Sequence, residues 1–326
     1  MRLLRRAFTS IFIFTVLIVP VASGAHASSE NTGSGMSTAL TDGAGPQKTT
    51  AEIAREMTNP LAAFYRFDLE GGYQTFSGDI DGADDQSNWF QQFRASIPFR
   101  EKNGKGWVFR FSLPYIDDQP VYWVERETYP EWHIRQLDPR EIGDGYWEPT
   151  HAHTDDVTLD LVYGGVSESG FILSYGIAGI LPTSSDTSNA RRQFSLGPLV
   201  NVGKMTDRGV YGALISHVID VSDNAYANVD TPDMNQTTVQ AYLSYGLGNG
   251  WQLVSNPVIT YDWEGDSGNK LNLPLGGGIA KTTRISKMPL RVSAEVQYFV
   301  ANTDRFGPDL LFKFSLSPLL PSKHTR

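Results

Sequence analysis

The stretch from Leu290 to Leu320 alternates between apolar and polar side chains in two consecutive runs. In the first run the two sets are Leu290, Val292, Ala294, Val296, Tyr298 and Val300 against Arg291, Ser293, Glu295, Gln297 and Phe299. Successive side chains of a β-strand point to opposite faces, so each run predicts a strand with one apolar and one mostly polar face. Such strands fit a soluble sandwich or a membrane barrel whose apolar face meets lipid. Each run is about ten residues long, the length that a tilted strand needs to cross a bilayer.

Similar runs recur through most of the chain. We expect twelve strands, at residues 62–76, 88–99, 106–115, 155–166, 170–181, 191–203, 208–220, 236–247, 250–263, 269–283, 287–301 and 308–320. The alternation is less regular in 170–181 and 208–220 than in the other segments. Because no amphipathic helix of useful length interrupts the series, the pattern predicts an all-β fold.

The connectors between these segments fall into two classes. Every second connector is short, as at 100–105, 167–169, 204–207, 248–249 and 284–286, whereas most of the others are longer and acidic. Short turns at one end and long loops at the other are typical of outer-membrane barrels, which have an even number of strands. We therefore predict a transmembrane antiparallel β-barrel of the bacterial outer membrane, with about 12 strands and both termini on the periplasmic side.

The N-terminal region indicates export. Arg2, Arg5 and Arg6 precede an apolar run, and Ala25-His26-Ala27 forms a cleavage site of the A-x-A type. Residues 1–27 are therefore predicted to be a signal peptide; the apolar run is short for the alternative, a retained membrane helix. We expect residues 28–60 to be a disordered periplasmic lead-in and 61–321 to form the barrel. A long extracellular loop is predicted at 116–154, and a periplasmic tail at 322–326.

Composition narrows the classes of partner and chemistry. The chain has no cysteine, which excludes disulfides and thiolate metal sites. Three of its 27 Lys and Arg residues lie in the leader and none of its 36 acids does, so the mature chain has a formal charge of −12. This charge argues against nucleic acid as a partner. No run of about 18 apolar residues follows Ala27, which argues against membrane-spanning helices.

Several short motifs resemble a known family. They are Leu181-Pro182-Thr183, Ser195-Leu196-Gly197-Pro198, Tyr211-Gly212-Ala213-Leu214, Asp230 to Gln236, Tyr261-Asp262-Trp263-Glu264, Pro274-Leu275-Gly276-Gly277-Gly278 and Phe306-Gly307-Pro308-Asp309. In this order they resemble the outer-membrane channel family linked to the meta-cleavage (MetA) pathway of phenol degradation, whose members are sometimes mislabelled neuromedin U. The resemblance covers about residues 170–321, and more faintly 60–115; residues 116–153 have no counterpart. It implies a twelve-stranded barrel that moves hydrophobic or aromatic small molecules, without catalytic residues.

Three constellations have residue types found in catalytic or metal sites. His151 and His153, followed by two aspartates, have zinc-ligand types, but no third ligand is fixed by sequence and exposed loop histidines are the simpler interpretation. The acidic stretch 79–85 resembles a calcium loop without its bidentate glutamate, which favours a solvated loop that could bridge to lipopolysaccharide through divalent ions. Ser216 and His217 suggest a hydrolase, but neighbouring strand residues face opposite ways. We predict no metal, no cofactor and no enzyme activity.

The polar faces of the strands are predicted to line the lumen. The charged lumen residues are expected to be Arg66, Asp68, Glu70, Arg94, Arg110, Asp160, Asp262, Arg291, Glu295 and Lys313. The long loop 116–154 carries an aromatic set that we expect either to contact solute or to form a protective lid: Tyr122, Trp123, Tyr129, Trp132, Tyr146 and Trp147.

The expected function is a porin-like outer-membrane channel of a Gram-negative bacterium for passive passage of small molecules, hydrophobic or aromatic ones by the resemblance. One alternative is a structural or surface-interaction barrel closed by charges that pair across the lumen. The other is an outer-membrane hydrolase. The expected partners are membrane lipid, lipopolysaccharide and a small-molecule solute, and the oligomeric state is left open.

Overall fold

The structure is a computed structural model. It describes residues 52–54, 64–101, 105–124, 145–186, 193–222, 233–285 and 288–321. The strands are β1 (Phe64–Ser77), β2 (Ser87–Arg100), β3 (Lys105–Asp117), β4 (Pro120–Val124), β5 (Gly145–Pro149), β6 (His153–Thr154), β7 (Val157–Val166), β8 (Phe171–Leu181), β9 (Ser195–Met205), β10 (Gly209–Asp220), β11 (Asn235–Gly248), β12 (Trp251–Ser255), β13 (Val258–Asp262), β14 (Leu271–Ile285), β15 (Met288–Ala301) and β16 (Gly307–Pro321). A 3-10 helix, η2 (Ala83–Asp85), lies between β1 and β2. The predicted signal peptide, and most of the predicted lead-in and tail, lie outside the described residues.

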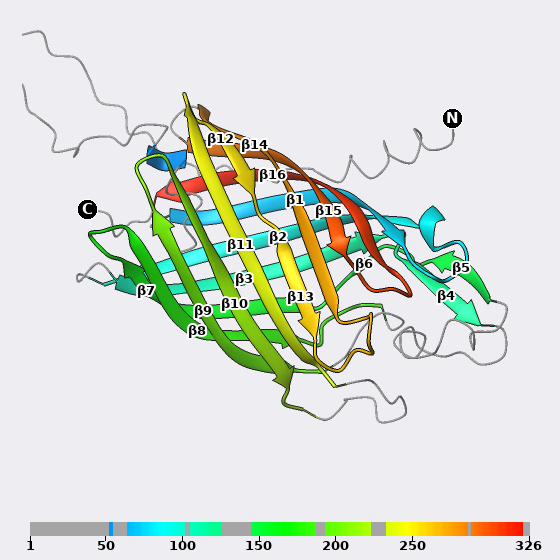
Figure 1. The fold of residues 1–326 in the computed structure, drawn as a ribbon. Coiled ribbons are helices and arrows are strands. Elements are labelled where there is room, and N and C mark those ends of the chain that lie inside the picture. Colours follow the sequence, from blue (N-terminus) through cyan, green and yellow to red (C-terminus); the bar gives the residue numbers. More distant parts are fainter. Residues whose placement is uncertain are drawn as a thin grey trace, which may run out of the picture. The chain divides into compact units, whose positions relative to one another are not determined.

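Each strand of the main sheet pairs antiparallel with its neighbours, and the ring closes where β1 pairs with β16 (Figure 1). The short strands β6 and β7 both pair with β3, and β12 and β13 both pair with β11 and β14, so each of these two couples occupies one position in the ring. In the described part of the chain the sheet is therefore a closed antiparallel barrel of twelve strands. The predicted fold class is confirmed.

Strand β15 shows how the alternation divides the two faces. Arg291, Glu295 and Gln297 are 9%, 5% and 1% exposed, whereas Val292 and Val296 are 46% and 45% exposed. The buried polar set lies on the inside of the ring and the exposed apolar set on the outside. This inversion of the usual arrangement is the one that a lipid solvent requires.

The ladder between β12/β13 and β14 is interrupted around Asn256-Pro257. Val254 pairs with Gly278 and Thr260 with Asn272, and the described backbone forms no ladder pairs between these two. Side chains from beyond β14 satisfy the backbone at the gap. Glu295 accepts from the Asn256 N–H (3.0 Å), and Gln297 Nε2 donates to the Asn256 carbonyl (3.2 Å).

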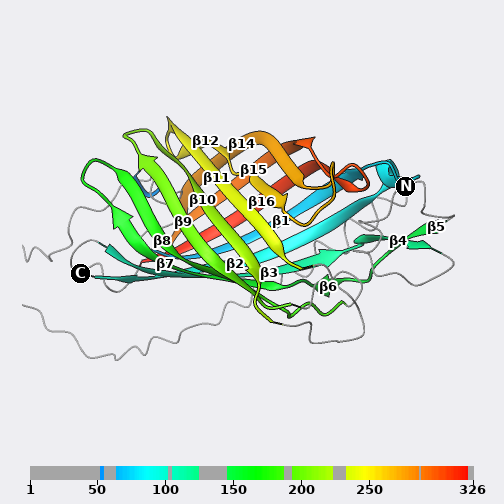
Figure 2. The ribbon, with the colours of Figure 1, turned by 60° about the horizontal axis from the view of Figure 1, so that its bottom comes forward.

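We call the end of the barrel with the short turns the near end and the opposite end the far end. At the far end, β4 and β5 form a two-stranded hairpin beyond the end of β3 (Figure 2). Its Tyr122 is buried with Ile80 and Ala83 of the β1–β2 connection. Trp147 packs on Phe306 of the β15–β16 connection, with ring centroids 4.6 Å apart, and its Nε1 donates to the Asp81 carbonyl (2.8 Å). Part of the predicted loop 116–154 is thus a folded hairpin that joins three connections.

The near end has tight turns and a helical turn. Gly248, Asn249 and Gly250 have φ values of 95°, 50° and 78°, the left-handed conformations that a two-residue hairpin loop needs. Residues 52–54, assigned by the sequence to the lead-in, are helical. Ile53 packs on Leu319 inside β16, and Gln252 Nε2 donates to the Ala54 carbonyl (3.1 Å). Among the described residues, no helix has the length and apolarity to span a membrane.

Candidate channel lumen

The inner face of the barrel carries charge on one side. We call the charged residues that the structure places on the inner face of β1, β2, β3, β7, β15 and β16 the charged wall: Arg66, Asp68, Glu70, Arg94, Arg110, Asp160, Arg291, Glu295 and Lys313. Their register brings opposite charges side by side, because Asp68 is level with Arg94, Arg110 with Asp160, and Glu295 with Lys313. Asp262, the tenth predicted lumen residue, is level with Gln236 near the far end of β13, outside this wall.

Ion pairs neutralise much of the charged wall. Arg66 Nε donates to Asp68 (2.8 Å), Arg94 donates to Glu70, and Arg110 donates to Asp160. The Ser317 hydroxyl on β16 also donates to Asp68, which joins the last strand to the first. Such pairing is what allows charges to be held in a confined space, because an unpaired charge removed from water is costly.

Asn256, between β12 and β13, bonds to two strands of this wall, β15 and β16, and was missed by the sequence interpretation. The Nδ2 of its side chain donates to Glu295 (2.7 Å). Its backbone carbonyl also accepts from the Lys313 ammonium (3.4 Å). Alternation alone gives no reason to select an asparagine. The available signal was the Asn256-Pro257 pair inside a predicted strand, since proline removes a ladder donor and marks an interruption.

The opposite side of the inner face carries more aliphatic side chains, with polar residues such as Ser174, Asn201 and Ser216 among them. We call the apolar wall the inward side chains from β7 to β11: Val162, Ile172, Ala178, Leu199, Val210, Leu214, Val218 and Tyr242. They are buried in two clusters, one around Leu199 and Leu214 and one around Ile172 and Val210. The sequence interpretation did not predict these residues for the lumen, because it selected charged side chains and because β8 and β10 are largely apolar on both faces. The irregular alternation of 170–181 and 208–220 was the signal.

Polar groups are enclosed in the apolar wall, and the Tyr242 hydroxyl links two of its strands. The Tyr242 hydroxyl crosses β10 and donates to Asn201 Oδ1 on β9 (2.9 Å). This reach needs glycine at two positions, because a Cβ on Gly203 or Gly212 would lie 2.4 Å from the hydroxyl oxygen. Asn201 and its cross-strand neighbour Ser174 are completely buried. The glycines therefore let a tyrosine brace three strands at the expense of lumen width.

The predicted aromatic set of the long loop is divided by the structure. Tyr122 and Trp147 contact each other and the neighbouring connections, with ring centroids 5.1 Å apart. Trp123 is half-buried and Tyr146 is exposed on the hairpin. Tyr129 and Trp132 lie outside the described residues. The rings of Tyr122 and Trp147 face other connections and hold the hairpin in place. Contact of Trp123 and Tyr146 with solutes stays a prediction.

The other constellations do not assemble into a metal or catalytic site within the described residues. The His153 ring is buried and its Nδ1 lies 2.9 Å from the His151 carbonyl. No group of three His, Cys, Asp or Glu side chains with metal-binding spacing occurs within the described ranges. Ser216 faces the lumen side, whereas His217 lies on the outer face with its Nδ1 2.9 Å from the Thr237 hydroxyl. These two residues are therefore not brought together.

Comparison with solved structures supports the architecture. An outer-membrane channel from Pseudomonas putida F1 matches with a TM-score of 0.51 and 12% identity, over 79% of this chain and 95% of that one. The protein is a β-barrel of the bacterial outer membrane. The NanC porin (TM-score 0.45, 11% identity, 77% and 98% coverage) and outer-membrane phospholipase A from Escherichia coli (0.37, 13%, 83% and 97%) also match. No family model and no curated protein matches the sequence.

Proposed function

We propose that this barrel is an outer-membrane channel for the passive passage of small hydrophobic or aromatic molecules. The observation that carries the proposal is the apolar wall. The interior of a porin for hydrophilic solutes is polar, whereas here Leu199, Leu214 and Val218 point inward from adjacent strands. In a lumen with one apolar and one charged wall, an apolar solute can contact the apolar wall along its path. The P. putida structure with this fold is itself described as a channel.

Uptake by cells tests this function. Cells producing the protein should take up a small aromatic such as phenol faster than cells without it, while uptake of a sugar of similar size changes little. Val218→Thr, which adds a hydroxyl inside the apolar wall, should lower aromatic uptake. The matched control is Ile219→Thr on the outer face of the same strand, 46% exposed. Equal uptake of the aromatic with and without the protein would contradict the proposal.

A closed barrel with a structural or surface role is the second candidate, and the near end favours it. The helical turn at 52–54 packs on the inner face of β16 and β12, with Ile53 4% exposed and Leu319 fully buried. In planar bilayers, Ile53→Asp should raise single-channel conductance if this turn narrows an open lumen, and Glu52→Asp should not. If neither the wild type nor Ile53→Asp conducts, the closed barrel is the better interpretation.

The far end supports contact with the outer leaflet as part of this proposal. Acids such as Asp79, Asp81 and Asp84 lie in the connection between β1 and β2, at the same end as the hairpin β4–β5. Divalent cations between such acids and lipopolysaccharide phosphates would hold the mouth of the barrel in the outer leaflet. Removing divalent ions with a chelator should then loosen the association of lipopolysaccharide with the purified protein.

A further inference from the structure

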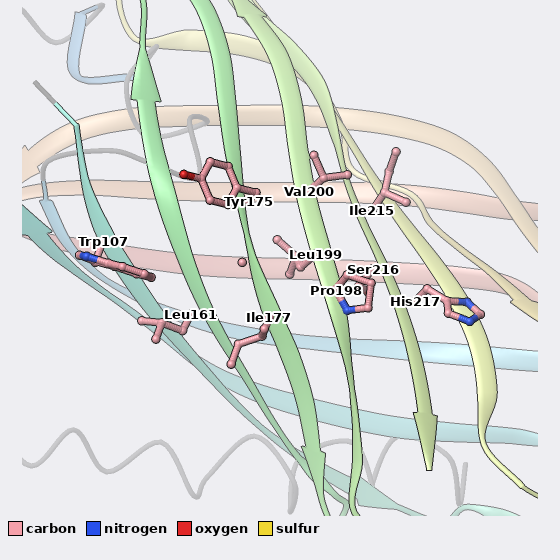
Figure 3. A pocket seen from close by; sticks show the side chains of 11 residues that line it. Trp107, Leu161, Tyr175, Ile177, Pro198, Leu199, Val200, Ile215, Ser216 and His217 are labelled. Carbon is pink, nitrogen blue, oxygen red and sulfur yellow. The ribbon is translucent and has the colours of Figure 1, made fainter. Parts of the chain in front are cut away.

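The outer face of the barrel is hollowed across β7 to β10. A groove of about 620 Å³ is lined by Trp107, Leu161, Tyr175, Ile177, Pro198 and His217, among others. In Figure 3 these side chains form a row from Trp107 at one end to His217 at the other. The volume falls within the range of small-molecule sites, about 300–1,000 Å³.

Most residues that line this groove belong to the outer, membrane-facing side of the barrel, and the inward positions Gly176, Leu199 and Ser216 also border it. Tyr175 and Ile177 are 61% and 50% exposed, whereas the alternate residues Ser174 and Ala178 are buried on the inner face. Ile177 is level with Pro198 and Tyr175 with Val200, so these four side chains share the outer face. The proposed channel function makes no use of this surface.

Pro198 explains the hollow. Its side chain is short and it has no N–H, and the ladder between β9 and β10 passes from Leu199–Ser216 to Leu196–Ile219 without the intervening pairs. The larger Ile177 stands beside it on β8. A short residue at a ladder interruption, flanked by branched and aromatic side chains, leaves a depression in an otherwise convex apolar surface.

Two lysines and an acid lie at one end of the groove, where the Tyr163 hydroxyl donates to Glu101 (3.1 Å). Trp107, Tyr163 and Tyr175 form an aromatic row, with ring centroids 5.0 and 6.1 Å apart, near the short β2–β3 and β7–β8 turns. Lys105 shares the outer face of β3 with Trp107, and Lys204 shares that of β9 with Val200. The Lys204 ammonium donates to the Ser169 carbonyl, and two of its three N–H donors remain for other acceptors.

The opposite end has different chemistry. There His217 lies edge-on to Trp263, with ring centroids 6.5 Å apart, and its Nδ1 is 2.9 Å from the Thr237 hydroxyl. Short turns mark the periplasmic side of such barrels, so the two lysines sit at the periplasmic interface. Lysines beside an aromatic belt at that level extend their ammonium groups to lipid phosphates.

We propose that the groove binds one glycerophospholipid of the periplasmic leaflet. An acyl chain lies along Tyr175, Ile177 and Pro198, and the phosphate is held by Lys105 and Lys204. The apolar lining matches the chain, and the position of the lysines selects a headgroup on the periplasmic side rather than a lipopolysaccharide from the other leaflet.

Native mass spectrometry of the full-length mature protein tests the site. The protein is released from detergent after titration with phosphatidylglycerol or phosphatidylcholine. The wild-type protein should retain one lipid at low molar ratios of lipid to protein, and it should prefer phosphatidylglycerol to phosphatidylcholine. Ile177→Trp, which fills the groove, should lose it, and Leu253→Trp, on the exposed outer face of β12, should keep it. Ile177→Phe supplies the same test should the tryptophan variant fail to refold.

The charged end is tested separately. Lys105→Gln with Lys204→Gln should weaken retention of phosphatidylglycerol severalfold. Lys281→Gln should not, although Lys281 also lies over an aromatic ring, 4.9 Å from the centroid of Trp251. Equal lipid retention by wild type and the groove-filling variants would overturn the proposal. So would retention of lipopolysaccharide in place of phospholipid, or a wild-type dimer that Ile177→Trp converts to a monomer, which would make a second copy the occupant.

Discussion

The charged wall and the apolar wall face the same lumen but are held together differently. The charged wall consists of paired side chains, such as Arg110 with Asp160 and Arg94 with Glu70. The apolar wall consists mainly of close-packed aliphatic side chains, and buried polar groups such as the Tyr242 hydroxyl and Asn201 are bonded between them. The first depends on charge balance and tolerates water, whereas the second depends on shape and the exclusion of water. A change that one wall accepts should therefore damage the other.

A charge placed in the apolar wall should have the largest effect. Leu214 is buried among aliphatic residues on β7 to β10, so Leu214→Glu puts a carboxylate where no cation is within its cluster. We expect a loss of about 3–5 kcal/mol in the free energy of unfolding, measured by urea titration of the refolded protein in lipid. Leu214→Met, which nearly keeps the volume, should cost less than about 1.5 kcal/mol. A stable Leu214→Glu variant would show that this wall is hydrated.

Removing one partner from the charged wall should have an intermediate effect. Glu70→Gln removes the carboxylate that pairs with Arg94. Asp68 remains level with Arg94, and the Arg94 side chain is 28% exposed, so the loss is compensated in part. We expect a loss of about 1–3 kcal/mol in the same urea titration. Glu101→Gln in the exposed β2–β3 turn should change stability by less than about 0.5 kcal/mol. If Glu70→Gln matched this control, the wall would be wet enough to screen its own charges.

Removing the hydroxyl of Tyr242 should have a smaller effect on stability than the two changes above. Tyr242→Phe removes the hydroxyl that bonds Asn201 and leaves the ring over the two glycines. We expect a loss of about 1 kcal/mol, because a single buried hydrogen bond is removed. Tyr245→Phe on the outer face of the same strand is the control, since its hydroxyl bonds Arg208 in an exposed turn. A larger loss for Tyr245→Phe would mean that the apolar wall does not need this brace.

The smallest effect is expected at the far rim, outside both walls. Burial raises the pKa of the Asp155 carboxyl, and the nearby Asp156 carboxylate raises it further. A carboxyl whose folded-state pKa is raised contributes stability below its ordinary pKa, and this contribution is lost as the pH rises through the raised value. Asp155→Asn should therefore flatten the pH dependence of unfolding in the range that begins at the ordinary aspartate value, about pH 4, and extends upward. An unchanged profile would contradict a buried carboxyl, and Asp84→Asn in the solvated η2 turn serves as the control.

The two walls also differ in how well their residues could be predicted from the sequence. Arg291 and Glu295 alternate with Val292 and Val296, so period-two reasoning placed the strand, its faces and its charges together. In β8, Ile172 and Leu173 are equally apolar, and no periodicity can tell which of them points inward. The number of strands and their bounds followed from turns and alternation. The inward packing of β8 to β11 depends on contacts between strands, which a single sequence does not contain.

Long-range contacts were the other limit. Trp147 and Tyr122 were selected as loop aromatics, but their contact with Phe306 and Ile80 joins connections that are far apart in the chain. Asn256 has the same character, because its partners Glu295 and Lys313 come from strands beyond β14. Residue type alone indicated that the aromatic side chains form contacts, without indicating their partners. The contacts that each side chain makes are determined by the closure of the barrel, which brings distant connections and strands together.

The pairing of β1 with β16 has a consequence for how the molecule is made. The Ser317–Asp68 contact joins residues 249 positions apart, so the ring closes late and against a large loop entropy. Until β16 is in place, β1 and β15 each present an open strand edge, the feature through which β-proteins aggregate. A chain truncated before Gly307 should therefore be recovered as aggregate rather than as a smaller barrel. The order of synthesis, with the closing strand last, makes protection of the nascent chain a requirement of this architecture.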